Sequence, residues 1–275
     1  MTTDNNLVFD VGMHLGEDSD FYLRKGFRVV ALEANPQLIE HCKVRFRDAI
    51  EAKHLHIVEG AVAPPEAGDS IAFYVSAQSV WGTAQMNWRE RNEAITKINV
   101  RRIDIHDVFS RFGIPHFMKV DIEGADVVVL NALLQCEGRP RYLSIEAEKV
   151  DFEALRAEVS LLSRLGYENF RAVQQQGIPG RVLHTKTISG QELVYTFEEH
   201  ASGPFGEDLV QPWRTSEQIL DEYRRIYKIY RLFGDRSLTR RLQSVVIRRI
   251  VKAGYMIATG YRGPLPGWYD THASL

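Results

Sequence analysis

Residues 7–16 have the sequence LVFDVGMHLG, in which an apolar run is followed by a turn that holds two glycines. The apolar run 6–11 predicts a short strand, and residues 19–25 continue as a helix. In open α/β sheets, ligands bind beyond the carboxyl ends of the strands, at the point where the winding reverses. The turn at 12–16 is therefore the first place where we expect a ligand.

Three residues of this stretch carry the prediction of a binding loop. Gly12 allows a sharp turn and a close approach to a ligand, while Gly16 allows the next helix to pack closely. Asp10 brings a carboxylate to the strand end, where an ammonium group or an ordered water can bind. The alternative is that the two glycines only terminate a strand, because their spacing alone is not specific.

A second β-α unit follows directly. Residues 28–32 form an apolar run of strand length that ends in Glu33, and Asn35-Pro36 opens a helix. A carboxylate at the end of the second strand can accept hydrogen bonds from both hydroxyls of an adenosine ribose. The loop lacks the full GxGxxG pattern, so a dinucleotide is less favoured. The two units together predict a site for a nucleoside cofactor.

The rest of the chain continues the alternation of strands and helices. Strands are expected at 55–58, 71–75, 117–120, 142–145, 168–173 and 192–197, and helices at 125–134, 152–165, 216–232 and 238–259. This alternation is typical of an α/β protein with a doubly wound, mostly parallel sheet that helices cover on both faces. The composition changes near residue 200, where we place a boundary.

The bulk composition is that of an ordinary globular protein. The chain has 275 residues, of which 44% are hydrophobic and 25% charged, and this excludes a disordered or fibrous class. We expect no leader peptide and no transmembrane segment. Cys42 and Cys136 form no framework of disulfides, so we expect buried thiols and a cytoplasmic location.

Charge is distributed unevenly along the chain. The net charge is −2, but residues 211–262 hold 12 Lys or Arg against 4 Asp or Glu. Such basic amphipathic helices can form a lid, a homodimer contact, an acceptor-binding surface or a membrane-surface contact. A nucleic-acid partner is not expected, because no recognised binding motif accompanies the charge.

The segments FDVGMHLGEDS, VVALEANP, VEGAVA and MKVDIEGAD, which lie within residues 7–148, resemble those of the FkbM family of S-adenosylmethionine-dependent methyltransferases. The resemblance implies a class I methyltransferase fold with a Rossmann-like cofactor domain, which we place at 1–200, while the change in composition sets residues 201–275 apart as a basic helical extension. It also implies a methionine site at Asp10, Gly12 and Gly16, a ribose contact at Glu33, and Gly60, Ala61 and Val62 near the adenine. We add the adjoining Met13, Ala34 and Asp121 as cofactor-binding candidates. The family commonly has Ala-Asn where this chain has Met13-His14.

Methyl transfer requires an aligned acceptor and a group that takes up one proton. Acids follow the predicted fourth and fifth strands, and parallel neighbours would bring them to the same edge of the sheet. The candidates for the base are, in order, Asp121, Glu146 and His14. A structural loop role is the alternative for His14.

Four further residues are candidates for binding the acceptor: Trp81, Thr83, Glu123 and Glu148. Trp81 and Thr83 offer an aromatic face beside a hydroxyl, a common way to bind a sugar or polyketide, although Trp81 can equally belong to the core. Glu123 can instead satisfy backbone donors at a helix start. A divalent metal on Asp121, Glu146 and Glu148 is a further alternative that we do not expect, and no zinc-type histidine spacing is present.

The resemblance and the motifs together predict O-methylation of a small-molecule hydroxyl, on a sugar, a glycan or a secondary metabolite. The alternatives are an N- or carboxyl-methyltransferase of a small molecule or peptide, an NAD-dependent oxidoreductase on the same type of fold, and a catalytically silent adaptor.

Overall fold

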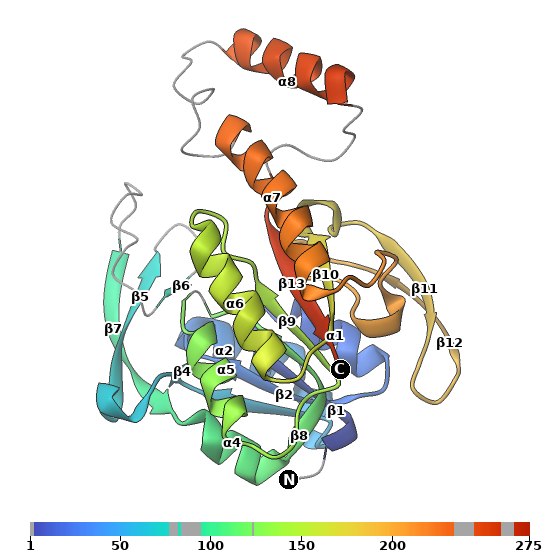
Figure 1. Cartoon of the computed structure of the whole chain (residues 1–275). Helices are drawn as coiled ribbons and strands as arrows, with labels where there is room; N and C mark the ends of the chain where they lie inside the picture. The colour runs from blue at the N-terminus through green and yellow to red at the C-terminus, as the bar shows by residue number, and fades with distance from the viewer. Residues whose placement is uncertain (1–2, 77–81, 84–94, 123, 234–244, 260–266) are drawn as a thin grey trace.

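The computed structural model describes residues 3–76, 82–83, 95–122, 124–233, 245–259 and 267–275. A seven-stranded sheet forms its centre (Figure 1). In spatial order the strands are β10 (Asn169–Gln174), β13 (Tyr269–Ser274), β9 (Tyr142–Glu146), β8 (Ile114–Val120), β1 (Thr3–Val11), β2 (Arg28–Glu33) and β3 (Leu55–Glu59). Only β13 runs antiparallel to its neighbours in this sheet. The expected doubly wound, mostly parallel sheet is confirmed, and its winding direction reverses between β1 and β8.

Helices cover both faces of the sheet. This cover is needed because the strands carry apolar side chains on both faces. One face carries α4 (Ile105–Phe112), α5 (Asp126–Leu134), α6 (Phe152–Arg164) and α7 (Ser216–Phe233). The other carries α1 (Glu17–Arg24), α2 (Pro36–Arg45) and α3 (Arg47–Glu51). Helix α8 (Val245–Thr259) lies beyond α7, away from the sheet (Figure 1).

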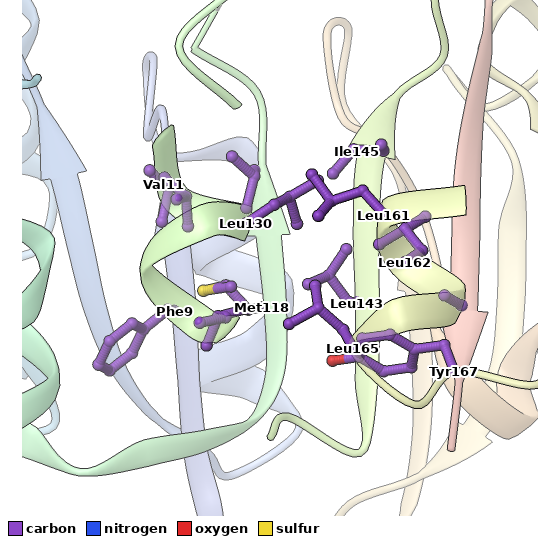
Figure 2. Close-up of a cluster of buried hydrophobic side chains, with 14 of the residues drawn as sticks. Phe9, Val11, Met118, Leu130, Leu143, Ile145, Leu161, Leu162, Leu165 and Tyr167 are labelled. Carbon is purple, nitrogen blue, oxygen red and sulfur yellow. The ribbon is translucent and has the colours of Figure 1, made fainter. Parts of the chain in front are cut away.

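Side chains of β1 point alternately into the two hydrophobic cores on either side of the sheet. Phe9 and Val11 face the α4–α7 layer, whereas Val8 faces the α1–α3 layer, and all three are fully buried. Figure 2 shows the first of these cores, where Leu143 of β9 and Met118 of β8 lie beside leucines of α5 and α6. This double burial fixes the register of the strands, because a slip of one residue would exchange the two faces.

Side-chain caps explain where several helices begin. Asn35 accepts a hydrogen bond from the backbone N–H of Gln37 and precedes Pro36, the first residue of α2. Asp104 and Asp151 cap α4 and α6 in the same way. Such caps stabilise a helix by about 1 kcal/mol each. The helix predicted to open at Asn35-Pro36 is therefore confirmed.

A smaller sheet is inserted after β3. It contains β4 (Ala61–Val62), β5 (Ser70–Ser76), β6 (Gly82–Thr83) and β7 (Ile95–Ile103), and β5 pairs with β7 over seven residue positions. Ala61 and Phe73 are part of its small buried cluster. The strand expected at 71–75 is confirmed as part of this insertion.

The strand expected at 192–197 was placed wrongly in the central sheet. It forms β12 (Glu192–Thr196), which pairs only with β11 (Val182–Lys186) in a separate hairpin. Only Tyr195 of β12 is buried, so the strand has one covered face and cannot occupy a sheet interior that is covered on both. The place in the sheet belongs instead to β13, whose residues Asp270–Ser274 are all buried.

Strand β13 belongs to the region 201–275, which was expected to be a helical extension, yet it is part of the central sheet. Thr271 of β13 and Tyr223 of α7 share a buried hydrogen bond of 2.6 Å between their hydroxyl oxygens. The boundary near residue 200 stays a prediction, but the chain beyond it is not all helical. The helix expected at 238–259 corresponds to α8, and its residues 238–244 lie outside the described part. No helix among the described residues is long and apolar enough to cross a bilayer.

Candidate functional site

A cavity opens at the carboxyl ends of β1, β2 and β8, where the winding of the sheet reverses. The empty space inside it, together with the solvent at its mouth, is about 950 Å³. Eight of the residues singled out in the sequence line it: Gly12, His14, Glu33, Ala34, Gly60, Ala61, Val62 and Asp121. The predicted β-α units thus bring these residues together at the expected edge of the sheet.

Gly12 makes the turn after β1 possible. Its φ is +95°, and a Cβ at this position would overlap the carbonyl oxygen of Asp121. The backbone N–H groups of Gly12 and Met13 both donate to the carbonyl of Leu32, each over 3.0 Å. The loop is thereby held between β2 and β8, and no residue with a side chain fits at position 12 without displacing one of them.

Glu33 ends β2 and its carboxylate is held in place by backbone donors. Oε2 accepts a hydrogen bond from the N–H of His14 at 2.9 Å, and Oε1 accepts from Ala34 and Asn35 at 2.9 and 2.8 Å. Burial raises the pKa of Glu33, and these hydrogen bonds oppose that rise. A carboxylate has about four acceptor positions, so Glu33 retains the capacity to accept from a ligand hydroxyl.

Asp10, Met13 and Gly16, also predicted to bind cofactor, do not line the cavity. Asp10 is fully buried and accepts a hydrogen bond from the hydroxyl of Ser19 at 2.7 Å. Met13 belongs to the core of the α1–α3 layer, and Gly16 contacts the ring of Phe46. These three residues support the loop from behind.

Lys119 is a site residue that the sequence analysis missed. It lies on β8, is almost fully buried and lines the cavity. Its Nζ is 3.0 Å from a carboxylate oxygen of Asp18, 3.5 Å from Asp121 and 3.8 Å from Asp10. Burial opposes protonation of Lys119, but these acids raise its pKa well above the usual range, so it carries a positive charge. A single lysine within the otherwise apolar strand segment FMKV, residues 117–120, is the signal that could have identified it.

Lys119 also influences the pKa of Asp10. Burial raises the pKa of Asp10 to about 7, although Lys119 opposes the rise. Lys119 and the two buried acids Asp10 and Asp18 therefore form a charged cluster at the wall of the cavity. Placing such charges away from water costs free energy, which favours a role in positioning Asp121 over a contribution to stability.

A segment distant in sequence closes one wall of the cavity. Asp18 accepts hydrogen bonds from the backbone N–H groups of Ser202 at 2.8 Å and Gly203 at 3.4 Å. This anchors the chain after β12 so that His200 lines the cavity, with its ring 5.4 Å from that of His14. No local motif predicted these contacts, because Asp18 and Ser202 are far apart in the chain.

His14 is oriented by its neighbours in the loop. Its backbone has a φ of +55°, which is uncommon for a residue with a side chain. Its Nδ1 lies 2.9 Å from Oε1 of Glu17. Burial is the largest influence on Glu17 and raises its pKa, but the hydrogen bond to His14 and further electrostatic contributions, including that of Lys119, together outweigh it and lower the pKa. His14 is therefore held by Glu17 and also lines the cavity.

Strands β8 and β9 are parallel neighbours with Val120 opposite Ile145, so Asp121 and Glu146 reach the same edge of the sheet as expected, but only Asp121 lines the cavity. Asp121 lines the cavity with a side chain that is 42% exposed. Glu146 pairs with Lys149 at 2.8 Å, and Glu148 accepts from the backbone N–H groups of Val150 and Asp151. Neither of the two glutamates lines the cavity. Among the described residues, no group of three or more His, Cys, Asp or Glu is arranged to hold a metal ion.

Three of the acceptor-binding candidates cannot be placed in the cavity. Trp81 and Glu123 lie outside the described residues. Thr83 is in β6, where its backbone pairs with Tyr74 of β5, and its side chain lies outside the described part. The contacts predicted for these residues stay predictions.

Acidic side chains dominate the charge of the cavity wall. Among the described residues of the wall are the four acids Glu17, Asp18, Glu33 and Asp121, against one lysine, Lys119. The first turn of α1, which begins at this edge, is itself acidic. Helix N-termini that hold phosphate present bare backbone N–H groups, and an acidic first turn repels such a ligand. The wall therefore suits a ligand with positive charge better than a pyrophosphate.

Comparison with solved structures shows distant likenesses. Precorrin-6y C5,15-methyltransferase from Geobacter metallireducens GS-15 is 14% identical, with a TM-score of 0.34 over 71% of this chain and 77% of that one. Precorrin 8w decarboxylase from Methanobacterium thermoautotrophicum is 12% identical, with a TM-score of 0.37 over 70% and 78%. The N-terminal domain of human METTL16 in complex with SAH is 10% identical, with a TM-score of 0.35 over 62% and 56%.

No curated protein matches this chain. The family described as the methyltransferase FkbM domain matches residues 10–168, which are more than half of the chain. The match begins at Asp10, at the end of β1, and extends past α6, so it contains most of the cavity wall. The chain therefore belongs to the FkbM family of methyltransferases.

Proposed function

We propose that this methyltransferase binds S-adenosylmethionine in the cavity between β1, β2 and β8 and methylates a hydroxyl oxygen of a small molecule, such as a sugar, a glycan or a secondary metabolite. The observation that carries the proposal is the pairing of the Gly12 turn with the Glu33 carboxylate at the reversal of the sheet. A nucleoside ligand needs this combination of a close backbone and a charged acceptor for its ribose.

The charge of the cavity supports S-adenosylmethionine over NAD. S-adenosylmethionine carries a sulfonium and an ammonium group, whereas NAD carries an anionic pyrophosphate. The four acids of the wall attract the former and repel the latter. Glu33 accepts from the ribose, while Gly60, Ala61 and Val62 line the part of the cavity beside β4, where the adenine is expected.

When bound, S-adenosylmethionine supplies an electrophilic methyl group. Asp121 is the cavity acid with the most exposed carboxylate, and in the proposed reaction it accepts the proton that the acceptor hydroxyl loses as its oxygen bonds to carbon. Lys119, 3.5 Å from Asp121, orients this carboxylate. The carboxylate of Glu146 pairs with Lys149, so we rank Glu146 below Asp121 as a candidate for the base.

The proposal includes a cytoplasmic location and no metal requirement. Cys42 and Cys136 are free thiols, as a reducing compartment allows. Activity that survives a chelator would agree with carboxylate-assisted proton transfer, and activity restored only by a divalent ion would contradict it.

Calorimetry with S-adenosylmethionine, S-adenosylhomocysteine and NAD tests the cofactor. We expect binding of the first two and none of NAD, and tight NAD binding without a response to the methyl donor would refute the proposal. Release of S-adenosylhomocysteine is then followed with panels of sugar hydroxyls, amines and carboxylates. Turnover with hydroxyl acceptors supports O-methylation, whereas turnover only with amines or carboxylates replaces it by the N- or carboxyl-methyl alternative.

A further inference from the structure

Helix α8 carries apolar residues that the rest of the described chain leaves uncovered. Ile250 and Ile257 are seven residues apart, which is two helical turns, so they lie on one face. Their side chains are 65% and 84% exposed. Large exposed apolar groups in a row indicate a surface that a partner covers.

The contact that positions α8 leaves this face open. The ring of Tyr255 packs against Phe233, the last residue of α7, with 5.1 Å between centroids. Tyr255 lies on the flank of α8, between the isoleucine face and the opposite side. Figure 1 shows α8 at the far end of α7, well away from the central sheet. The exposed fractions of Ile250 and Ile257 show that this contact does not cover them.

The opposite side of α8 is basic. Residues 245–259 contain three basic residues and no acidic residue. Lys252 lies on the side away from Ile250 and Ile257, and Arg249 lies on the flank between the two sides. The combination of an apolar face with an opposite side whose charged residues are all basic is that of helices that lie in the interface of a bilayer.

We propose that α8 docks on an anionic lipid surface, with Ile250 and Ile257 at the acyl boundary and the basic side chains among the headgroups. With 15 residues and three charges the helix is too short and too polar to span the bilayer. Charge complementarity selects the partner, because a second copy of the chain would present the same basic helix, whereas an anionic headgroup layer is attracted to it. This inference is independent of the proposed methyl acceptor.

Vesicle flotation of the full chain tests the proposal. Vesicles of phosphatidylcholine alone are compared with vesicles that also contain phosphatidylglycerol. We expect selective binding to the anionic vesicles, which weakens when salt is raised from about 0.05 to 0.5 M. Ile257→Asp should reduce binding about tenfold, because a carboxylate replaces a buried side chain at the acyl boundary. Arg249→Ala should reduce it about fivefold, as expected for one basic residue near the surface.

The matched control is Val210→Asp. Val210 is 76% exposed in the loop before α7, so this variant adds the same charge at an exposed apolar position away from α8. It should bind vesicles as the unchanged protein does, and circular dichroism should show that all three variants are folded. Equal binding to neutral and anionic vesicles, or Ile257→Asp behaving as Val210→Asp, would overturn the proposal. So would the loss of a dimer in Ile257→Asp, seen by light scattering without vesicle binding, since it would assign the face to a second copy.

Discussion

Glu33 reaches the cavity with its carboxylate already fixed by three backbone N–H groups. Such a residue does not need to be ordered by its ligand, so little of the binding free energy is lost in positioning it. The donors come from the loop after β1 and from the start of α2. The shape of that loop and the orientation of Glu33 therefore depend on each other.

Glu33→Ala should weaken binding of S-adenosylhomocysteine by about 1.5 to 3 kcal/mol, because ribose hydroxyls lose a charged acceptor. Calorimetry at equal protein concentration measures this as roughly a tenfold to a hundredfold rise in Kd. Glu59→Ala is the control, since Glu59 is the register partner of Glu33 on β3 but pairs with Lys43 outside the cavity. Equal Kd values for the two variants would show that Glu33 does not bind the ribose.

Asp121→Asn should slow turnover far more than it weakens cofactor binding. An amide keeps the shape of the side chain but is a poor proton acceptor, and it leaves Lys119 with one acid fewer. Single-turnover kinetics and calorimetry separate the two effects. Glu146→Gln should have the smaller effect on turnover because Glu146 does not line the cavity. A reversed ranking would make Glu146 the base.

Residues near the strand ends could be predicted, and those that depend on distant contacts could not. Gly12, Glu33 and Asp121 follow apolar runs, so their placement at one edge follows from the parallel sheet alone. Lys119 was missed because a lysine in a strand is more often a surface residue. His200 reaches the cavity only because the backbone of Ser202 is bound to Asp18, and sequence spacing contains no trace of that contact.

At the scale of elements, β13 is the least expected part of the fold. Four of its six residues are polar or charged and buried, namely Asp270, Thr271, His272 and Ser274. Burial lowers the pKa of His272 to about 3, so this histidine is neutral inside the sheet. The strand is held by backbone pairing to β9 and β10 and by side-chain bonds such as that of Thr271 to Tyr223.

Tyr223→Phe should lower the free energy of unfolding by about 1 to 3 kcal/mol, because it leaves the buried hydroxyl of Thr271 without its partner. Urea titration measures the loss. Adding Thr271→Val should recover much of it, since both polar groups are then replaced by apolar ones of similar shape. Additive losses in the double variant would show that the two hydroxyls do not form the link between α7 and β13.

The prediction of elements succeeded where local signals exist. Asn35-Pro36 marks the start of α2 through a cap and a fixed φ, both of which are local. By contrast, Glu192–Thr196 is more apolar than Tyr269–Ser274, yet the polar segment occupies the sheet interior. Local composition favoured the wrong strand, because long-range pairing and the contacts of α7 decide which of the two is buried.

At the scale of the whole molecule, buried carboxyl groups determine how stability varies with pH. Burial raises the pKa of Glu158 to about 7, with Glu148 and Asp126 adding to the rise. Between about pH 4.5 and 7 the unfolded chain releases a proton that the folded chain retains. The free energy of unfolding therefore falls as pH rises through this window.

Glu158→Gln should remove this part of the pH dependence while keeping an acceptor for the backbone N–H of Glu148. Relative to the unchanged protein, the variant should gain stability as pH rises from about 4.5 to about 7. Urea midpoints across that range give the comparison. Asp10, whose pKa is also raised to about 7, remains in both proteins, so parallel profiles would show that Glu158 titrates normally.

The central place of β13 has a consequence for biosynthesis. Every other strand of the sheet leaves the ribosome before residues 269–274 do, so β9 and β10 emerge without the neighbour that they share. Unpaired strand edges of this kind recruit foreign strands. This half of the sheet can close only after residues 269–274 have been synthesised, and until then the open edges of β9 and β10 are the part of the domain that a chaperone would cover.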